Sequence, residues 1–174
     1  MRRMAVRSIV AALLLLVGTS VAQAQFASPI RFNLHGGAAL PVGDAGDTWD
    51  LGFRLGAGLE FRVPLFPVGL RIDGAYDRLG SEFGDATLNI WSATGNAVLS
   101  PMMLPIYFIG GIGAYWPDTG EPGEDTEAEF GFNLGGGFQM PVPGFSPFIE
   151  ARWHRITGDG ADFDYVPIVF GIRF

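Results

Sequence analysis

Cysteine and lysine are both absent from this 174-residue chain. Without cysteine, the protein can have neither a disulfide framework nor a thiolate metal site. The 11 basic residues are therefore all arginines, and they face 18 acidic residues, which gives a formal net charge of −7. Because contacts with nucleic-acid phosphates need clustered positive charge, this composition predicts a protein that does not bind nucleic acid.

Long apolar runs are also missing beyond the N-terminal segment, where no stretch approaches the ~20 apolar residues of a transmembrane helix. The N-terminal segment has early arginines, an apolar run over 9–17 and the small-residue site Ala22-Gln23-Ala24. This layout is typical of a cleaved secretory signal. The sequence therefore predicts a signal peptide over 1–24 and a single domain over 25–174, with 8 arginines against 18 acidic residues after cleavage.

The remaining chain is dominated by apolar residues at every second position. In the stretch 51–62, "LGFRLGAGLEFR", leucine, phenylalanine and alanine alternate with glycine, arginine and glutamate. Alternate side chains of a β-strand point to opposite faces, so each such run has one apolar face. Eight strands are predicted, over 29–40, 51–62, 68–78, 86–99, 105–116, 128–140, 147–157 and 165–174. In the fourth strand the apolar phase changes, and we expect a β-bulge near Trp91 to restore it.

The connections between these predicted strands alternate in length. The connections around 41–50, 79–85, 117–127 and 158–164 are longer and acidic, whereas the other three connections are short and rich in proline. Short turns at one end, long loops at the other and an even strand number are typical of a bacterial outer-membrane barrel. The predicted fold class is all-β, an eight-stranded antiparallel up-and-down transmembrane β-barrel.

A soluble sandwich or a lipocalin-like barrel is the alternative for such a pattern. Either fold would bury its apolar face and expose its polar face to water. Here half of the non-apolar face is glycine, which suits the filling of a narrow lumen better than a wet surface. The bands of leucine, isoleucine and phenylalanine suit contact with lipid, so the membrane barrel is favoured.

Opposite charges suggest how neighbouring strands pair. If the second and third strands are joined so that Glu60 faces Arg71, the same register places Arg54 opposite Asp77. The alternative, an arginine turned to lipid at mid-membrane, would cost ~2–4 kcal/mol. For the last hairpin, the same reasoning predicts that Glu150 faces Arg173, with Trp153 beside Phe170.

Eleven charged residues fall in the phase that should point into the lumen: Arg31, Arg54, Glu60, Arg62, Arg71, Asp73, Asp77, Glu129, Glu150, Arg152 and Arg173. Desolvated charges are tolerated only when they are paired, and an eight-stranded barrel has room only for its own side chains. We therefore predict a closed lumen ion-pair network formed by Arg54, Asp77, Glu60, Arg71, Asp73, Glu129, Glu150, Arg152 and Arg173. Arg78 and Arg155 fall in the lipid-facing phase near the long loops, where they can extend to the membrane surface or meet lipopolysaccharide phosphates.

The segments "GGAALPVGD", "FGFNLGGGFQ", "PFIEARWHRI" and the terminal "GIRF" resemble those of small outer-membrane β-barrel proteins of the OmpA-like, porin-family type. The resemblance covers the whole predicted mature chain. It implies that the last strand is recognised by the outer-membrane assembly machinery, with Phe174, Ile172, Phe170 and Ile168 as the assembly signal. The chain ends on that strand, so the periplasmic peptidoglycan-binding domain of larger relatives is expected to be missing.

Support for catalysis or for a bound cofactor is weak. Only His35 and His154 offer imidazoles, and no serine lies one or two residues from either. The late His-x-Ser element of lipid A deacylases corresponds here to His154, Arg155 and Ile156, with isoleucine in place of the serine. The acidic loops lack the spacing of a defined calcium site. We expect no catalytic residue, cofactor or metal.

The favoured function is that of an integral outer-membrane barrel with a side-chain-filled lumen and a structural or surface-interaction role. A narrow porin-like channel for small solutes or ions is the alternative, and a lipid A-modifying enzyme is the third hypothesis. The expected partners are outer-membrane lipids, lipopolysaccharide, and the assembly machinery and periplasmic chaperones during biogenesis. The protein is expected to be a monomer of the cell outer membrane.

Overall fold

Eight long strands make up nearly all of the structure. The computed structural model describes residues 29–62, 66–81, 86–101, 104–120, 127–140, 142–158 and 162–174, so the predicted signal peptide over 1–24 lies outside the described residues. The strands are β1 (Ile30–Pro41), β2 (Gly52–Arg62), β3 (Val68–Gly80), β4 (Thr87–Leu99), β5 (Ile106–Asp118), β6 (Glu129–Gln139), β7 (Ser146–Thr157) and β8 (Phe163–Arg173). All eight predicted strands are present.

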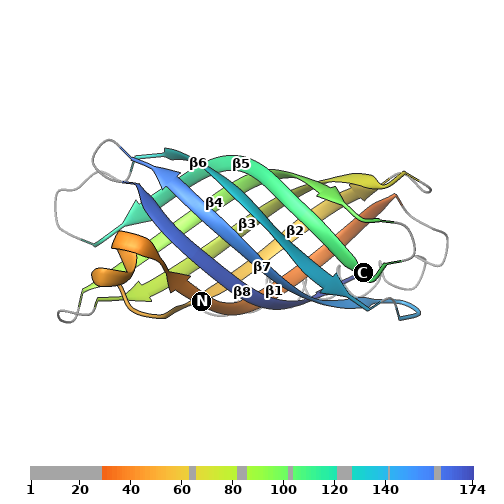
Figure 1. Cartoon of the computed structure of the whole chain (residues 1–174), viewed down its shortest axis with the longest axis horizontal. Coiled ribbons are helices and arrows are strands. Elements are labelled where there is room, and N and C mark those ends of the chain that lie inside the picture. Colours follow the sequence, from red (N-terminus) through yellow and green to blue (C-terminus); the bar gives the residue numbers. More distant parts are fainter. Residues whose placement is uncertain are drawn as a thin grey trace, which may run out of the picture.

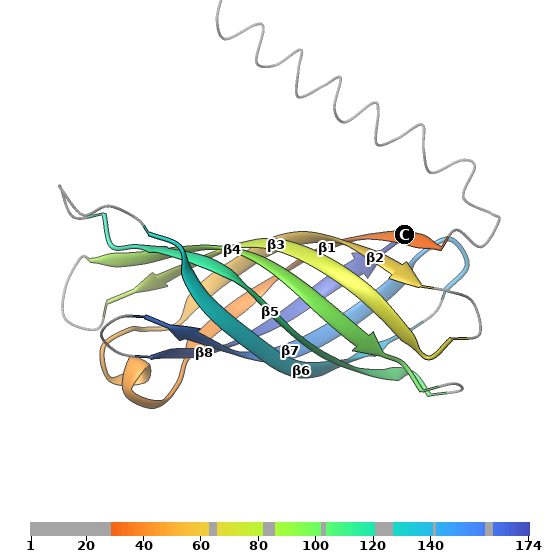
Figure 2. The ribbon, with the colours of Figure 1, turned by 90° about the horizontal axis from the view of Figure 1, so that it is seen from above.

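The strands close into one antiparallel barrel in which each strand pairs with its sequence neighbours and β1 pairs with β8. Figure 1 shows the strands strongly tilted against the long axis of the barrel. The start of β1, the end of β8 and the three short connections lie at one end (Figure 2), which we call the short-turn end. The opposite end, which carries the longer connections, is called the long-loop end. The predicted fold class is confirmed.

The two faces of the barrel wall are inverted relative to a soluble protein. Leu59 and Ile72 on the outer face are 54% and 68% exposed, whereas Arg54 and Glu60 on the inner face are 2% and 0% exposed. Inward polar groups and outward apolar groups make up the arrangement expected for a wall surrounded by lipid.

The described part of the chain contains no helix that is both long and apolar enough to cross a membrane. Its helical element is the short 3-10 helix η2 (Gly43–Asp47), between β1 and β2.

The strand registers agree with the sequence prediction in one hairpin and disagree in another. Between β2 and β3, Glu60 is the Cα partner of Arg71 and Arg54 that of Asp77, as predicted. Between β7 and β8 the prediction is wrong, because Glu150 faces Val169.

In the same hairpin, Arg173 faces Ser146, and Phe170 faces Ile149 and not Trp153. The observed β7–β8 register is displaced by an even number of residues from the predicted one. An even displacement keeps every side chain on its predicted face, so the alternation of faces does not distinguish the two registers.

The expected β-bulge near Trp91 is also wrong. The pairing of β4 with β3 is continuous from Thr87 to Leu99. The change of apolar phase has another cause, because Leu88 and Ile90 point into the barrel, where they are 5% and 0% exposed. The lumen therefore becomes apolar toward the long-loop end.

Glycines on the inner face make room for large neighbouring side chains. Gly135 is the partner of Arg152 on β7, and a Cβ at Gly135 would collide with the Arg152 side chain and with the Ala151 backbone oxygen. At Gly137 a Cβ would collide with the Tyr107 ring. The glycine content of β6 is thus a requirement of lumen packing.

Candidate functional site

Four charged side chains form a closed ring across the middle of the lumen, which we call the charge quartet: Arg71 and Asp73 on β3, and Glu150 and Arg152 on β7. Arg71 contacts Asp73 at 2.8 Å and Glu150 at 2.8 Å. Arg152 completes the ring, with contacts to Glu150 at 2.7 Å and to Asp73 at 3.3 Å. Strands β3 and β7 are four strands apart in either direction around the barrel, so the charge quartet spans the full width of the lumen.

Neutral polar groups surround the charge quartet. Tyr107 of β5 donates to Glu150 at 2.6 Å, and Asn96 of β4 donates to Asp73 at 3.0 Å. Asn133 of β6 donates in turn to Asn96 at 2.9 Å. The four quartet side chains are at most 3% exposed. Buried ions are tolerated when further hydrogen bonds satisfy them. Here the ion pairs and hydrogen bonds together also link the five strands β3 to β7 through their side chains.

A second layer closes the lumen toward the long-loop end. Arg54 and Asp77 pair at 3.0 Å, and Tyr165 donates to the same carboxylate at 3.3 Å. Beyond them lies an apolar cluster, here called the apolar cap, whose buried members are Ala39, Leu79, Leu88, Ile90, Tyr115, Ile156 and Tyr165.

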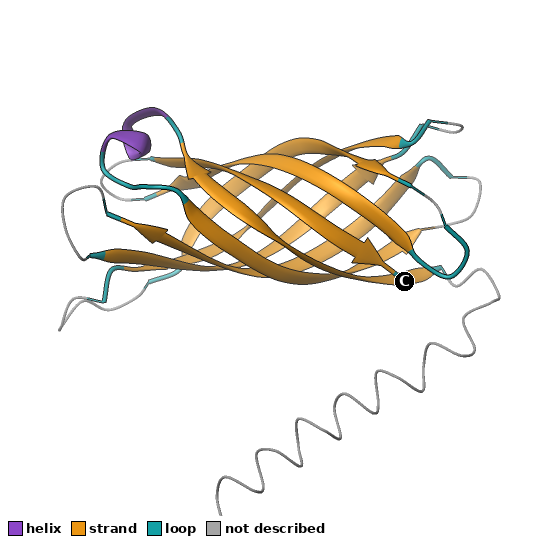
Figure 3. Ribbon diagram, turned by 90° about the horizontal axis from the view of Figure 1, so that it is seen from below, coloured by secondary structure: helices purple, strands orange, loops and turns teal. Residues whose placement is uncertain are grey.

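The first long connection also contributes to this closure. Trp49 packs against the apolar cap, and the backbone N–H groups of Val42 and Asp50 donate to the carbonyls of Asp164 and Gly80 at 3.0 and 2.8 Å. Figure 3 shows η2 folded beside the mouth of the barrel at the long-loop end. A continuous water-filled path from this end would require the apolar cap and the connection between β1 and β2 to move.

A third group of charges lies near the short-turn end. Glu60 contacts Arg62 at 2.7 Å and Arg173 at 3.5 Å. Arg173 also donates to Gln139, and its guanidinium lies 5.1 Å from the centre of the Phe148 ring.

The predicted network residues are therefore distributed over three levels. The predicted Arg54–Asp77 ion pair is present. Glu60 and Arg71 are Cα partners, but their side chains bind other groups: Arg71 reaches across the lumen, and Glu60 binds arginines at the short-turn end. Glu129 lies on β6 opposite Tyr115, partly buried, near the long-loop end. The pairs across the lumen join β3 and β7, which are not hydrogen-bonded neighbours, so strand register does not predict them.

The predicted assembly-signal residues share the outer face of the last strand. Ile168, Phe170 and Phe174 are 43%, 61% and 45% exposed, and Ile172 is partly buried on the same face. Their recognition by an assembly machinery stays a prediction.

Both histidines point into the lumen and contact neutral groups. The His154 ring stacks on Tyr165 with centroids 5.0 Å apart, and its Nδ1 lies 2.9 Å from the Tyr115 hydroxyl. His35 Nδ1 lies 3.1 Å from the Asn33 side-chain oxygen. Within the described ranges, no three His, Asp or Glu side chains gather closely enough to hold a metal ion.

Of the two arginines predicted on the lipid face, Arg78 is exposed and Arg155 is held by carboxylates. Arg155 makes a two-pronged contact with Asp164 at 2.8 and 2.6 Å, and it lies 5.1 Å from the Trp153 ring centre. Because its charge is already offset, Arg155 is less available to an external phosphate than the sequence suggested.

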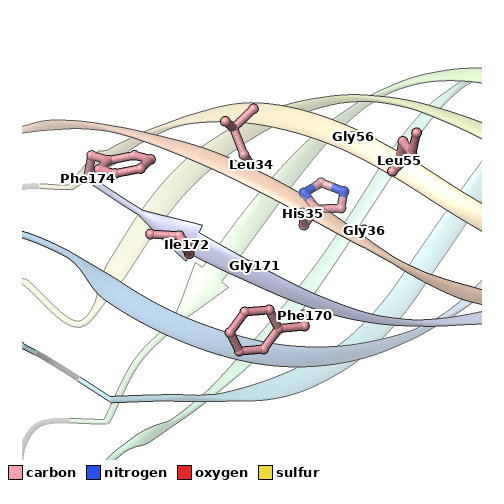
Figure 4. Close-up of a pocket in the computed structure, with 9 residues that line it drawn as sticks. All are labelled: Leu34, His35, Gly36, Leu55, Gly56, Phe170, Gly171, Ile172 and Phe174. Atoms are coloured by element: carbon pink, nitrogen blue, oxygen red, sulfur yellow. The ribbon is translucent and has the colours of Figure 1, made fainter. Parts of the chain in front are cut away.

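A shallow apolar groove of about 460 Å³ runs along the outer wall where β8, β1 and β2 meet. Figure 4 shows Leu34, Leu55 and Phe174 at its edges. Its full lining consists of Leu34, His35, Gly36, Leu55, Gly56, Phe170, Gly171, Ile172 and Phe174. The glycines leave the wall thin here, and large apolar side chains form the sides.

An eight-stranded closed barrel with an apolar outer wall and a charged interior is an outer-membrane β-barrel. The family comparison agrees with this class: the family model "Outer membrane protein beta-barrel domain" matches residues 9–174. The chain belongs to this family, and its location is the outer membrane.

Solved structures similar to this chain show the same fold. Neisserial surface protein A superposes with a TM-score of 0.63 at 14% identity, covering 84% of this chain and 96% of that one. Ail, the attachment invasion locus protein of Yersinia pestis, gives a TM-score of 0.56 at 19% identity, covering 84% of this chain and 100% of that one. Among curated proteins, none matches this sequence.

Proposed function

We propose that this protein is a monomeric outer-membrane barrel with a closed lumen, serving a structural or surface-interaction role. The observation that carries the proposal is the closure of the lumen at two levels, by the charge quartet and by the apolar cap. A pore needs a continuous path for water and solute, and both layers would have to rearrange to provide one. The short-turn end would face the periplasm and the long-loop end the cell exterior, as in other barrels of this class.

The charge of the connections at the long-loop end indicates the charge that a surface partner should carry. The connections at 42–51, 81–86, 119–128 and 158–162 contain many acidic residues and no arginine. Ail has been solved in complex with the heparin analogue sucrose octasulfate. For this chain a polyanion is a poor fit, because it would carry charge of the same sign as these connections. Cationic partners suit the exterior better.

Solute flux tests the closed lumen. Purified protein reconstituted into liposomes should give no swelling above empty liposomes with small sugars or amino acids, because the quartet and the cap block the path. The matched comparison is the Arg152→Ala variant, which opens the quartet on one side. If the unmodified protein conducts, and the variant changes the rate, the lumen is a channel and the proposal is wrong.

The surface role is tested on intact cells. Cells that display the protein should retain a fluorescent cationic peptide, and Asp44→Asn, Asp47→Asn and Asp50→Asn together should reduce retention. Labelled heparin, which is negatively charged, serves as the comparison probe. Stronger retention of heparin than of the peptide would contradict the assignment.

A lipid A-modifying activity is tested separately by mass spectrometry of lipid A from expressing cells. Unchanged acyl chains are the expected result, since both imidazoles are held inside the lumen by tyrosine and asparagine side chains. Lipid A that has gained or lost an acyl chain would establish an enzyme.

A further inference from the structure

The charges inside the barrel balance at two levels but not at the third. The charge quartet contains two arginines and two carboxylates, and toward the long-loop end Arg54 pairs with Asp77. Near the short-turn end, three arginines lie on the lumen face with one carboxylate. We call these four residues the arginine mouth: Arg31, Arg62, Arg173 and Glu60. Three positive charges against one negative charge leave an excess of two positive charges at this level.

The surrounding sequence supplies no further carboxylate side chain. The connections at 63–67, 100–105 and 140–145 contain no charged residue. Phe174 exchanges backbone hydrogen bonds with Phe32 at 2.8 and 3.3 Å, and among the described residues it forms no ion pair with an arginine. The positive charge therefore stays in excess unless an anion from outside the chain binds.

Strand pairing brings the four side chains of the arginine mouth together. Arg31 on β1 is the Cα partner of Glu60 on β2, and Arg173 on β8 is the partner of Asn33, two residues further along β1 on the same face. The Glu60 carboxylate, however, contacts the other two arginines, Arg62 at 2.7 Å and Arg173 at 3.5 Å. Arg31 lies beside this occupied carboxylate, and within the described part of the chain it has no ion pair of its own.

One arginine of the mouth is buried and another is open to solvent. Arg173 is 1% exposed, and its Nε–H has no hydrogen-bond partner among the residues that the structure describes. Buried donors without partners are destabilising, and so are buried charges without counter-charges. Arg31 is only half-buried, and it is the second residue of β1. Because its side chain lies on the lumen face, solvent reaches it through the end of the barrel and not through the wall.

We propose that the arginine mouth binds a small soluble oxyanion of the phosphate class, which enters through the short-turn end of the lumen and is held by the Arg31 guanidinium. Guanidinium groups bind phosphate oxygens with strong, charge-assisted hydrogen bonds that are often two-pronged. An anion with two negative charges would balance the excess of this level. The phosphate of a membrane lipid does not fit, because the barrel wall separates the lumen face from the surrounding lipid.

This inference goes beyond the proposed surface role, since a lumen that passes no solute can still hold an anion at its inner end. In the cell, the periplasm would supply the anion if the short-turn end faces it. The binding test does not depend on that orientation, because both ends of the barrel are accessible in detergent. Binding of an oxyanion and flux of solutes through liposomes are separate measurements, so either proposal can fail without the other.

Isothermal titration calorimetry with inorganic phosphate, on the barrel in nonionic detergent at constant ionic strength, tests the site. The unmodified protein should bind one phosphate per barrel. Arg31→Gln removes one of the two excess charges and should weaken binding about tenfold or more, and Arg31→Glu removes both and should abolish it. Arg78→Gln, which removes an exposed arginine on the outer face near the long-loop end, is the matched control and should leave binding unchanged.

Glu60→Gln should change binding in the opposite direction. This variant removes the carboxylate that competes with phosphate for the arginines, so phosphate should bind more tightly. Phosphate should also raise the urea midpoint of the unmodified protein more than that of Arg31→Glu. Phosphate stabilises folded proteins in general, so only the difference between the two proteins reports the site. Heat-dependent gel migration checks the folding of each variant.

Three results would overturn the proposal. The first is the absence of saturable phosphate binding to the unmodified protein. The second is equal weakening by Arg31→Gln and Arg78→Gln, which would indicate general attraction to a charged surface. The third comes from competition: free glycerol phosphate should displace phosphate and phosphatidylglycerol should not. Displacement by phosphatidylglycerol would place the site on the lipid-facing wall.

Discussion

The charge quartet provides the sharpest prediction about stability, because it pairs side chains that the strand register does not bring together. Glu150 accepts hydrogen bonds from Arg71, Arg152 and Tyr107, at 2.6 to 2.8 Å. Glu150→Ala leaves two buried arginines with one carboxylate between them, so the site gains one uncompensated positive charge. Removing one partner of a buried ion pair costs about 3–5 kcal/mol.

The double variant discriminates the cross-lumen pairing from a neighbour pairing. Arg71→Met alone leaves an excess negative charge, whereas Arg71→Met with Glu150→Ala restores neutrality and keeps the Arg152–Asp73 contact. The double variant should therefore be less destabilised than the two single variants combined, with a coupling of about 2–3 kcal/mol. The control cycle uses Glu60→Ala with Arg71→Met. Although these residues are Cα partners, they bind different groups, so their effects should add within about 0.5 kcal/mol.

The assay is urea unfolding of the protein in lipid vesicles, followed by tryptophan fluorescence, with heat-dependent gel migration to confirm folding. A coupling for Glu60 and Arg71 as large as that for Arg71 and Glu150 would refute the argument. It would mean that the side chains pair along the strands, as the sequence alone suggests.

Three further predictions use the same unfolding measurement. Ile112→Arg, at the lipid-facing centre of β5, should lower the free energy of unfolding by about 2–4 kcal/mol, and Ile106→Arg, at the end of the same strand, by about 0–1 kcal/mol. The reason is that the penalty for a charge in lipid depends on its depth in the membrane. Equal losses for the two variants would contradict a membrane placement. Gly137→Ala should prevent folding or destabilise the barrel strongly, since its Cβ would collide with a tyrosine ring and a backbone carbonyl, whereas Gly95→Ala should be nearly neutral; a folded, stable Gly137→Ala would show that the lumen is loosely packed there. Arg155→Met, which removes a partly exposed ion pair, should change stability by less than about 1 kcal/mol, and a larger loss would mean that this pair is shielded from water.

Period-two alternation was sufficient to predict every strand and the inverted polarity of the wall. It failed at the long-loop end of β4, because the rule that apolar side chains face lipid does not hold where the lumen itself is apolar. Leu88 and Ile90 belong to the apolar cap, which only the closed barrel assembles. From one strand in isolation, a bulge was the simpler interpretation.

The error in the last hairpin has a different origin. Charge complementarity suggested that Glu150 pairs with Arg173, but inside a narrow barrel a long side chain can reach strands on the far side. The contacts present in the observed register are Arg155 with Asp164 and His154 with Tyr165. The first of these is an opposite-charge pair visible in the sequence. This pair at the loop end of the hairpin favours the observed register.

The two halves of the charge quartet are separated by 79 residues along the chain. Arg71 and Asp73 lie on β3, and Glu150 and Arg152 lie on β7, four strands later along the chain. Each half pairs internally, but without β7 the buried side chains of β3 lack the cross-lumen contacts that Glu150 and Arg152 supply. The same contact that holds the finished cylinder together would thus penalise truncated or wrongly ordered intermediates, and it acts as a built-in check that the cylinder is complete.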